Sequence, residues 1–387
     1  MINFSRYFSV RNIASFTLIF MSVQFLFVEG WAISIPKVAF MAITPILILA
    51  KTPYISKAVI FGSLFWVVTV GMSIVQFGLT SRMSTFYYSA LFLLTFILYY
   101  NLVYINKVFG IEQFIGLIKI VIYAYAIVLI LQQLFYFIGI RYMPLINLMN
   151  QPYYNLFRLN SLAIEPSHAG RLLAVYFYAF LKLIEYKEGS TPSIKMLWKD
   201  YRILIITFLY TMVGIGSGTA FIALAILLLY FLKRQYVLLV ICIAIAIYSL
   251  IPIINFEPLD RAVNIFHATM SGDVDIVTKT DNSAAARVNT ILNTINNLDL
   301  TKSETWFGQG IDSNKYVENA IVSAISEYGL ISYIFKLILF FSCCFNSLFS
   351  LEIIMFILLF SFNIGNIAYG WATLMIFSTI KYFKHNS

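Results

Sequence analysis

Ionisable side chains are concentrated in one short segment, Arg158 to Arg171, of an otherwise apolar chain. Hydrophobic residues make up 61% of the 387 residues and charged residues only 11%, so the two arginines, Glu165 and His168 stand out. Arginine guanidinium groups bind phosphates through paired hydrogen bonds, and a glutamate or histidine can move a proton during a reaction. The segment therefore predicts an anion site, with Arg158 and Arg171 as ligands and Glu165 or His168 as the acid or base.

Pro166 indicates how the chain positions these groups. Proline disfavours helix at the residue before it and suits the first turn of a helix, so a helix should begin directly after Glu165. His168 then lies at the mouth of that helix, and Arg171 lies in its first two turns, facing away from lipid. The alternative is a purely structural role, in which Arg158 reaches lipid phosphates and Glu165 pairs with Arg171.

The composition of the whole chain predicts a membrane protein built from helices. The mean hydropathy is +0.86, which excludes an ordinary soluble domain, and repeated apolar runs of roughly 17–25 residues are typical of transmembrane helices. We expect an all-α, polytopic helical bundle of about twelve transmembrane helices, which forms a single membrane domain over residues 1–387. The expected spans are 13–29, 32–50, 58–78, 84–105, 116–139, 168–185, 202–215, 219–232, 235–254, 319–341, 346–362 and 365–382.

The positions of lysine and arginine predict the orientation of this bundle. Loops rich in these residues mark the cytoplasmic side of a membrane. We therefore expect both termini in the cytoplasm and a first span that is retained, with the loops 140–167 and 255–318 on the outer side. The net charge of +9 reflects this asymmetry and does not suggest nucleic acid as a partner. The orienting residues are Arg6, Arg11, Lys51, Lys57, Lys107, Lys119, Lys187, Lys195, Lys199, Arg202, Lys233, Arg234, Lys381 and Lys384.

The long outer loop 255–318 contributes a second candidate cation. We expect the loop to be partly helical, because apolar residues recur at helical spacing around Arg287. Arg287 is a candidate anion ligand, although a lone arginine on an external helix is more often a solvated surface residue. Before this loop, the glycine-rich segment Gly214–Gly218 lacks the lysine of a phosphate-binding loop, which favours a tight turn between two helices.

We expect no metal and no cofactor. Cys242, Cys343 and Cys344 all lie in apolar runs and lack the spacing of metal ligands, so they are interpreted as buried apolar residues. The chain also contains no nucleotide-binding or zinc-protease motif.

Taken in order, these features resemble the superfamily of O-antigen and capsular polysaccharide polymerases (Wzy-type) and O-antigen ligases. The resemblance covers most of the chain from about residue 150 to 335 and depends on the order of its motifs, each of which is weak alone. The matching features are Arg158 with Glu165-Pro166 before a span, Ser217-Gly218-Thr219 at the start of an apolar run, a long outer loop with Arg287, Gly308-Gln309-Gly310, and the segment from Glu318-Asn319 to Glu327-Tyr328-Gly329.

The resemblance implies a metal-independent glycosyltransferase of the bacterial cytoplasmic membrane. Such a polymerase joins oligosaccharide repeat units, carried on a polyprenyl diphosphate, into O-antigen or capsular polysaccharide at the outer leaflet. By position, Arg158 and Arg287 are the best matches for the arginines that hold the diphosphate, with Arg171 as a third candidate. The implied partners are the lipid-linked oligosaccharide, membrane lipid and a separate chain-length regulator protein.

One departure from the family pattern favours the polymerase branch. Ligases carry a His-Asn pair after the glycine turn, where this chain has Glu318-Asn319. The general base is left open between Glu165, His168 and Glu318. Direct attack of an acceptor hydroxyl on the sugar of the diphosphate predicts inversion at the anomeric carbon.

Two other functions are compatible with the sequence. One is a glycan ligase of the same superfamily, and the other is a polytopic polysaccharide transporter or flippase. Polar groups deep in many spans would favour a transporter. The expected spans are almost free of ionisable residues, with Lys37 and Lys336 as the main exceptions, so chemistry at the outer surface is the preferred interpretation.

Overall fold

The chain folds into a bundle of helices. A computed structural model describes residues 9–25, 34–77, 83–140, 142–143, 147–148, 156, 158–231, 299–309, 320–360, 365 and 367–386. Its helices are α2 (Val10–Ser22), α3 (Ile35–Lys51), α4 (Lys57–Phe77), α5 (Met83–Tyr104), α6 (Ile111–Phe137), α7 (Pro166–Glu188), α8 (Ile194–Ile215), α9 (Gly218–Leu228), α14 (Ser303–Phe307), α15 (Ala320–Cys343), α16 (Leu351–Phe360) and α17 (Ala368–Asn386), with a short 3-10 turn, η2 (Leu229–Phe231), after α9.

The structure confirms an all-α architecture of the kind that membrane proteins adopt. Four helices of the described chain contain windows long and apolar enough to cross a membrane, and α2, α16 and the stretch Gly218–Phe231 are shorter apolar helices. The four windows are Lys57–Ile74, Thr85–Tyr104, Ile111–Phe137 and Ala324–Cys343. The expected span 235–254 and most of the expected outer loop 255–318 lie outside the described residues.

The expected end of the first span was wrong. The expected first span 13–29 is a shorter helix, α2, which ends at Ser22. Its 13 residues extend about 20 Å at 1.5 Å per residue, which is less than the hydrocarbon core of a bilayer. The expected loop 140–167 contains two short antiparallel strands, β1 (Tyr142–Met143) and β2 (Asn147–Leu148).

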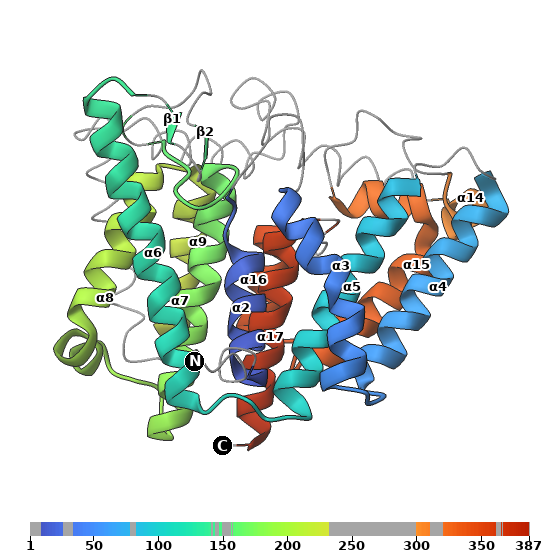
Figure 1. Ribbon diagram of the computed structural model, residues 1–387, viewed down its shortest axis with the longest axis horizontal. Coiled ribbons are helices and arrows are strands. Elements are labelled where there is room, and N and C mark those ends of the chain that lie inside the picture. The colour runs from blue at the N-terminus through green and yellow to red at the C-terminus, as the bar shows by residue number, and fades with distance from the viewer. Residues whose placement is uncertain are drawn as a thin grey trace, which may run out of the picture.

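The helices run alternately between two faces of the bundle (Figure 1). We call the face with the strands and the start of α7 the upper face, and the opposite one the lower face. On the lower face, Arg11 at the start of α2 donates from Nε to the Val108 carbonyl oxygen at 3.3 Å. Lys187 near the end of α7 pairs with Glu112 at the start of α6 at 2.5 Å. The basic helix ends that were expected to share one side of a membrane therefore share one face of the bundle.

Helix α7 lies at the centre of one half of the molecule. Nearly every residue from Ala169 to Ile184 is buried, and α7 packs against α6, α8, α9 and α17. Small residues let two helices approach closely: a Cβ on Gly170 would lie only 2.6 Å from the Ala220 Cβ on α9. This contact fixes the upper end of α7 against its neighbour.

Helix α17 joins this half to the other, because it contacts α7, α5 and α2. Figure 1 shows α2, α16 and α17 between the group α6–α9 and the group α3–α5 with α15. The Tyr99 hydroxyl of α5 hydrogen-bonds the Thr379 hydroxyl of α17 at 2.8 Å. Near the lower face, the Lys381 ammonium donates to three carbonyl oxygens at the end of α15, those of Phe341, Ser342 and Phe345. Polar bonds thus anchor the C-terminal half of α17.

Candidate functional site

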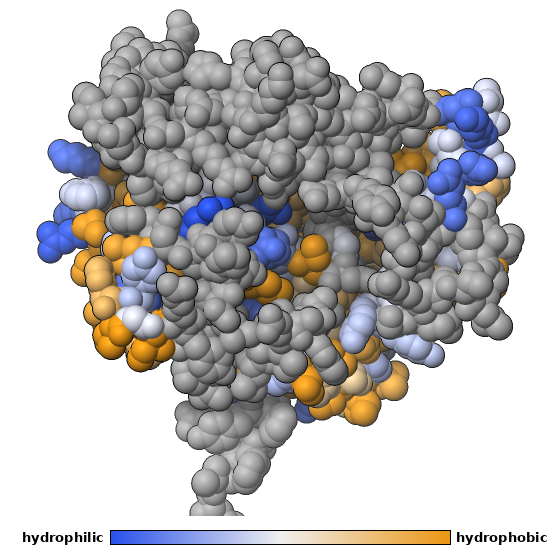
Figure 2. All heavy atoms as spheres, turned by 90° about the horizontal axis from the view of Figure 1, so that it is seen from above, coloured by the Kyte–Doolittle hydropathy of each residue, from blue (hydrophilic) through white to orange (hydrophobic). Residues whose placement is uncertain are grey.

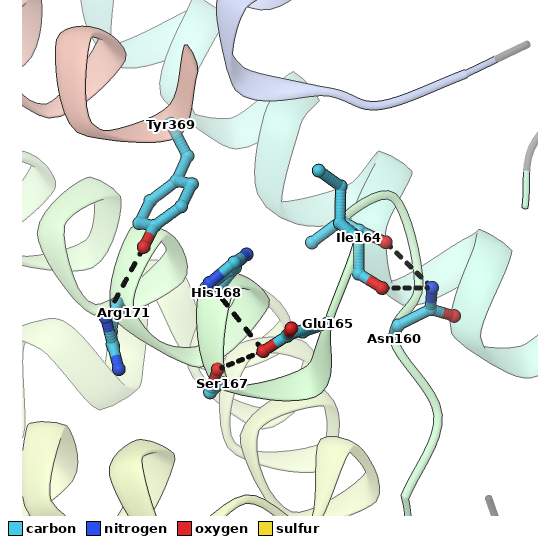
Figure 3. A network of polar contacts seen from close by, with 8 residues as sticks. Asn160, Ile164, Glu165, Ser167, His168, Arg171 and Tyr369 are labelled. Atoms are coloured by element: carbon cyan, nitrogen blue, oxygen red, sulfur yellow. Dashed lines mark hydrogen bonds and ion pairs between the residues drawn. The ribbon is translucent and has the colours of Figure 1, made fainter. Parts of the chain in front are cut away.

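The upper end of α7 begins as the proline predicted. Glu165 is the residue before the helix and has extended backbone angles, φ −133° and ψ 152°, while Pro166 occupies the first turn. The Ser167 hydroxyl donates to the Glu165 carboxylate at 3.3 Å. The same carboxylate lies 3.7 Å from Nε2 of His168 (Figure 3). Glu165 and His168 therefore form an adjacent carboxylate–imidazole pair.

Arg171 lies one turn further along the same helix and is partly buried. One terminal nitrogen donates to the Tyr369 hydroxyl of α17 at 3.4 Å, a long hydrogen bond (Figure 3). Its Nε is buried without a hydrogen-bond partner, and within the described part of the chain no carboxylate forms an ion pair with it. The structural alternative, a Glu165–Arg171 pair, is therefore wrong: Glu165 faces His168 instead. The guanidinium retains hydrogen-bonding capacity for a ligand.

Tyr369 connects the two functional groups of α7. Its ring stacks on the His168 ring with centroids 4.2 Å apart and an angle of 26° between the planes. The same side chain accepts the hydrogen bond from Arg171. Tyr369 is separated from Arg171 by 198 residues in sequence, and nothing in its sequence environment distinguishes it from the chain's many membrane-facing aromatic residues.

A buried loop supports the start of α7. Ser161 adopts a left-handed conformation with φ 51°, which is uncommon for a residue with a side chain. Hydrogen bonds hold it there: its backbone N–H donates to the Gln132 side chain of α6 at 2.8 Å, and its hydroxyl donates to the Tyr125 carbonyl oxygen at 2.6 Å. Gln132 also donates to the Asn160 side chain at 3.1 Å. Arg158 stands immediately before this anchored loop and is partly buried.

A buried lysine reaches the same loop from α3. Lys37 donates from Nζ to the Gln24 side-chain oxygen at 3.0 Å. The backbone N–H of Gln24 in turn donates to the Leu162 carbonyl oxygen of the loop at 2.7 Å. No acidic side chain pairs with Lys37 among the described residues. Lys37, noted in the sequence only as an exception within a span, therefore places a buried amino group beside the loop.

The glycine-rich segment before α9 is a tight turn, as expected. Helix α8 ends at Ile215, and Gly216 adopts the left-handed conformation with φ 57°. Helix α9 then begins at Gly218. Its Ala220 contacts Gly170 of α7, which follows His168 by two residues. The turn positions the α9 backbone beside the candidate site.

The segments around Gly308 and Gly329, both noted in the sequence, contact each other elsewhere on the bundle. Gly308, with φ +85°, packs directly on the α15 backbone: a Cβ there would lie 2.5 Å from the Glu327 carbonyl oxygen. Gly329, with φ +81°, interrupts α15 at the same place, and the Gln309 N–H donates to the Ser326 carbonyl oxygen at 2.6 Å. We call this contact the α14–α15 joint. The sequence signals at Gly308 and Gly329, weak when taken singly, are parts of one structure.

A local turn precedes α14 and the α14–α15 joint. The Thr301 hydroxyl and backbone N–H donate to the Asp299 carboxylate at 2.6 and 3.0 Å. These hydrogen bonds, with Lys302 nearby, hold the pKa of the Asp299 carboxyl below its usual value. Trp306 donates from its indole to the Leu300 carbonyl oxygen at 2.9 Å. This bond holds α14 against the residues that directly precede it.

The other expected site residues, Arg287 and Glu318, lie outside the described residues, as does Gly310. Within the described residues, no group of three or more histidine, cysteine or acidic side chains could hold a metal ion. Cys343 and Cys344 are buried free cysteines, as their apolar surroundings predicted.

The described part of the site carries an excess of positive charge. Arg158 and Arg171 lie beside the loop and near the α7 N-terminus, where the helix dipole adds a partial positive charge, while Glu165 supplies one negative charge. Seen from above, hydrophilic residues show near the middle of the upper face (Figure 2). No protein-family model, no curated protein and no solved structure matches the chain. The function must therefore be argued from the geometry and from the motif order.

Proposed function

We propose that the protein is a polymerase of surface polysaccharide, which joins oligosaccharide repeat units carried on a polyprenyl diphosphate. The observation that supports this most is Arg171: a partly buried guanidinium in the first turns of a helix, beside the Glu165–His168 pair, with a buried Nε that has no hydrogen-bond partner among the described residues. A cation without an ion-pair partner at the edge of a membrane bundle is costly unless a ligand supplies the opposite charge. A diphosphate supplies the charge and the paired acceptor geometry that arginine prefers.

The proposed reaction is a single displacement. A hydroxyl oxygen of the acceptor glycan attacks the anomeric carbon of the donor, the bond from that carbon to the diphosphate oxygen breaks, and the lipid diphosphate leaves with the electron pair. Arg171, together with Arg158 and Arg287, stabilises the departing charge without a metal. His168 takes the proton of the acceptor hydroxyl, and Glu165 orients the imidazole, as a carboxylate does for a histidine base.

The rest of the proposal concerns the membrane. We place the bundle in the bacterial cytoplasmic membrane as about twelve spans, with the lower face and both termini in the cytoplasm and the upper face outside. The concentration of basic helix ends on the lower face supports this orientation. The upper face then meets the lipid-linked donor, whose diphosphate lies at the level of the lipid headgroups.

A deletion strain tests the function. Surface glycan is extracted and its length distribution is compared with that of the parent strain. Single repeat units in place of long chains are expected after deletion. Full-length polymer that accumulates on the lipid carrier would instead indicate a ligase, and an unchanged length distribution would refute the proposal.

Variants at position 171 test the site. Arg171→Ala should lower polymer formation by about 100-fold or more, the usual effect of removing a donor that stabilises developing charge. Arg171→Lys should recover little activity, because lysine lacks the paired donors. Tyr369→Phe keeps the ring against His168 and removes the hydroxyl that holds Arg171. Polymer formation should therefore fall less in this variant than in Arg171→Ala. The matched control is Arg202→Ala, an exposed arginine near the lower end of α8, which should polymerise normally.

Membrane levels of every variant are measured with a tag. Normal chain length in Arg171→Ala at normal membrane level would refute the diphosphate role of this residue.

A further inference from the structure

A second polar site lies inside the other half of the bundle. A cavity of about 210 Å³ opens between α4, α5, α15 and the start of α17. At roughly 30 Å³ for each water molecule in the liquid, this volume corresponds to about seven waters, the size of one sugar ring. We call it the α15 cavity, and its polar lining includes Thr69, Ser89, Glu327, Ser332 and Lys336.

The polarity of this lining is unusual for its position. Thr69, Glu327, Ser332 and Lys336 all lie in helix windows long and apolar enough to cross a membrane. Ionisable groups at such positions are expensive and mark functional pathways or ligand sites. The Thr69 and Ser332 hydroxyls hydrogen-bond each other across α4 and α15, and each hydroxyl still has capacity for a second bond.

Aromatic surfaces complete the walls of the cavity. Phe65, Tyr328, Tyr333 and Trp371 line it beside the polar groups. The Trp371 indole is fixed by its hydrogen bond to the Gly365 carbonyl oxygen at 3.1 Å. A pyranose ring has apolar C–H faces that lie on aromatic rings and a rim of hydroxyls that bond carboxylates, ammonium groups and other hydroxyls. The mixture of surfaces in the cavity matches this ligand class.

The cavity and the Arg171 site flank the same helix end. Trp371 lines the cavity, whereas Tyr369 contacts His168 and Arg171. Residues two apart on an α-helix project about 200° from each other. The start of α17 therefore has the candidate diphosphate site on one side and the α15 cavity on the other.

The α14–α15 joint borders the cavity at its upper end. Glu327 lies two residues before the break at Gly329, and its carbonyl group is held against Gly308. The joint thus holds the segment that carries the Glu327 carboxylate. A ligand site needs its charged groups to be held in defined positions at the edge of the cavity.

We propose that the α15 cavity binds a terminal sugar ring of the acceptor glycan. Glu327 and Lys336 bond its hydroxyls, and the part of the Trp371 indole that lines the cavity lies against its apolar face. This inference rests on the proposed function, because it assigns the acceptor to one side of α17 and the lipid diphosphate of the donor to the other.

The test uses the full-length protein in lipid nanodiscs and two separate probes. One probe is a single repeat unit, without lipid, prepared from the cell's own surface polysaccharide. The other is a polyprenyl diphosphate. Glu327→Gln and Trp371→Phe should each weaken binding of the repeat unit by about tenfold or more, since the first loses a hydrogen bond to a charged group and the second loses part of the indole surface that lines the cavity. Neither substitution should change the affinity for the diphosphate, which Arg171→Ala should weaken.

The matched control is Ser73→Ala. Ser73 is a buried hydroxyl of α4 that bonds the Thr69 carbonyl oxygen and is absent from the cavity lining. Thermal unfolding of each variant separates a lost ligand contact from a lost fold.

Equal binding of the repeat unit to the wild type and to both cavity variants, or no binding to the wild type, would overturn the inference. Loss of cation or proton flux in the cavity variants, with sugar binding intact, would also overturn it and would assign the cavity to ion passage. The proposed function fails separately: if deletion of the gene leaves polymer length unchanged while the cavity variants still lose the repeat unit, the cavity stands as a sugar site in a protein of another function.

Discussion

Gly170→Ala is the substitution whose effect the structure defines most sharply. A methyl group at this position would lie 2.6 Å from the Ala220 Cβ and 3.0 Å from the Ala220 Cα. Both neighbouring atoms are attached to the α9 backbone, so no change of rotamer relieves the clash. Ordinary contact begins at 3.4 Å, and the two helices must therefore separate by about 1 Å.

The expected cost follows from two opposing effects. Overpacking of this kind destabilises a protein by about 2–3 kcal/mol, while alanine improves the intrinsic helix preference over glycine by about 1 kcal/mol. Gly116→Ala in α6 is the matched control, because a Cβ there meets no atom within 4 Å and only the helix preference changes. The two variants should therefore differ in free energy of unfolding by about 2–3 kcal/mol, or roughly 5 °C in melting temperature.

The separation of α7 from α9 should also lower activity. His168 and Arg171 flank Gly170, and a misplacement of about 1 Å can cost about 100-fold in rate. The assay combines thermal unfolding in detergent with the length distribution of surface glycan. Ala220→Gly should restore part of both properties in the double variant, because it removes the nearer of the two clashing atoms. If Gly170→Ala unfolds at the same temperature as Gly116→Ala, the proposed contact between α7 and α9 does not exist.

Two other substitutions test the supports of the bundle. Gln132→Leu removes the acceptor of the Ser161 N–H and should cost about 2 kcal/mol or more, measured as a lower melting temperature together with shorter glycan; an unchanged melting temperature would show that the loop does not depend on this side chain. Lys381→Met leaves three carbonyl oxygens of α15 without their donor and should lower the melting temperature by a similar energy, yet glycan made at a permissive temperature should keep its normal length. A length defect at that temperature would contradict a purely structural role for Lys381.

The sequence predicted those parts of the site that depend on neighbouring residues. Pro166 located the start of α7, because the restriction that proline places on its own φ and on the preceding residue is local. The glycines around 216 predicted a tight turn for the same reason. The concentration of charge between Arg158 and Arg171 was visible in composition alone.

The partners of these residues could not be predicted. Tyr369 and Gln132 meet the segment through packing between helices that are far apart in sequence, and such contacts leave no local pattern. The structural alternative paired Glu165 with Arg171, six positions along the chain, whereas helix geometry favours His168 at i, i+3 spacing, which is the contact that forms. Length was misjudged where apolar residues continue past a helix end, as they do after Ser22.

The contact at Gly170 and the α14–α15 joint differ in how they can change during evolution. At Gly170 the obstacle is a side-chain methyl, so a larger residue at 170 can be accommodated by a smaller one at 220, and relatives of this chain should show the two positions varying together. At the α14–α15 joint, main chain meets main chain, and Gly308 and Gly329 both have positive φ. No substitution in the partner segment can make room there. These two glycines should stay invariant while the helices around them drift in sequence.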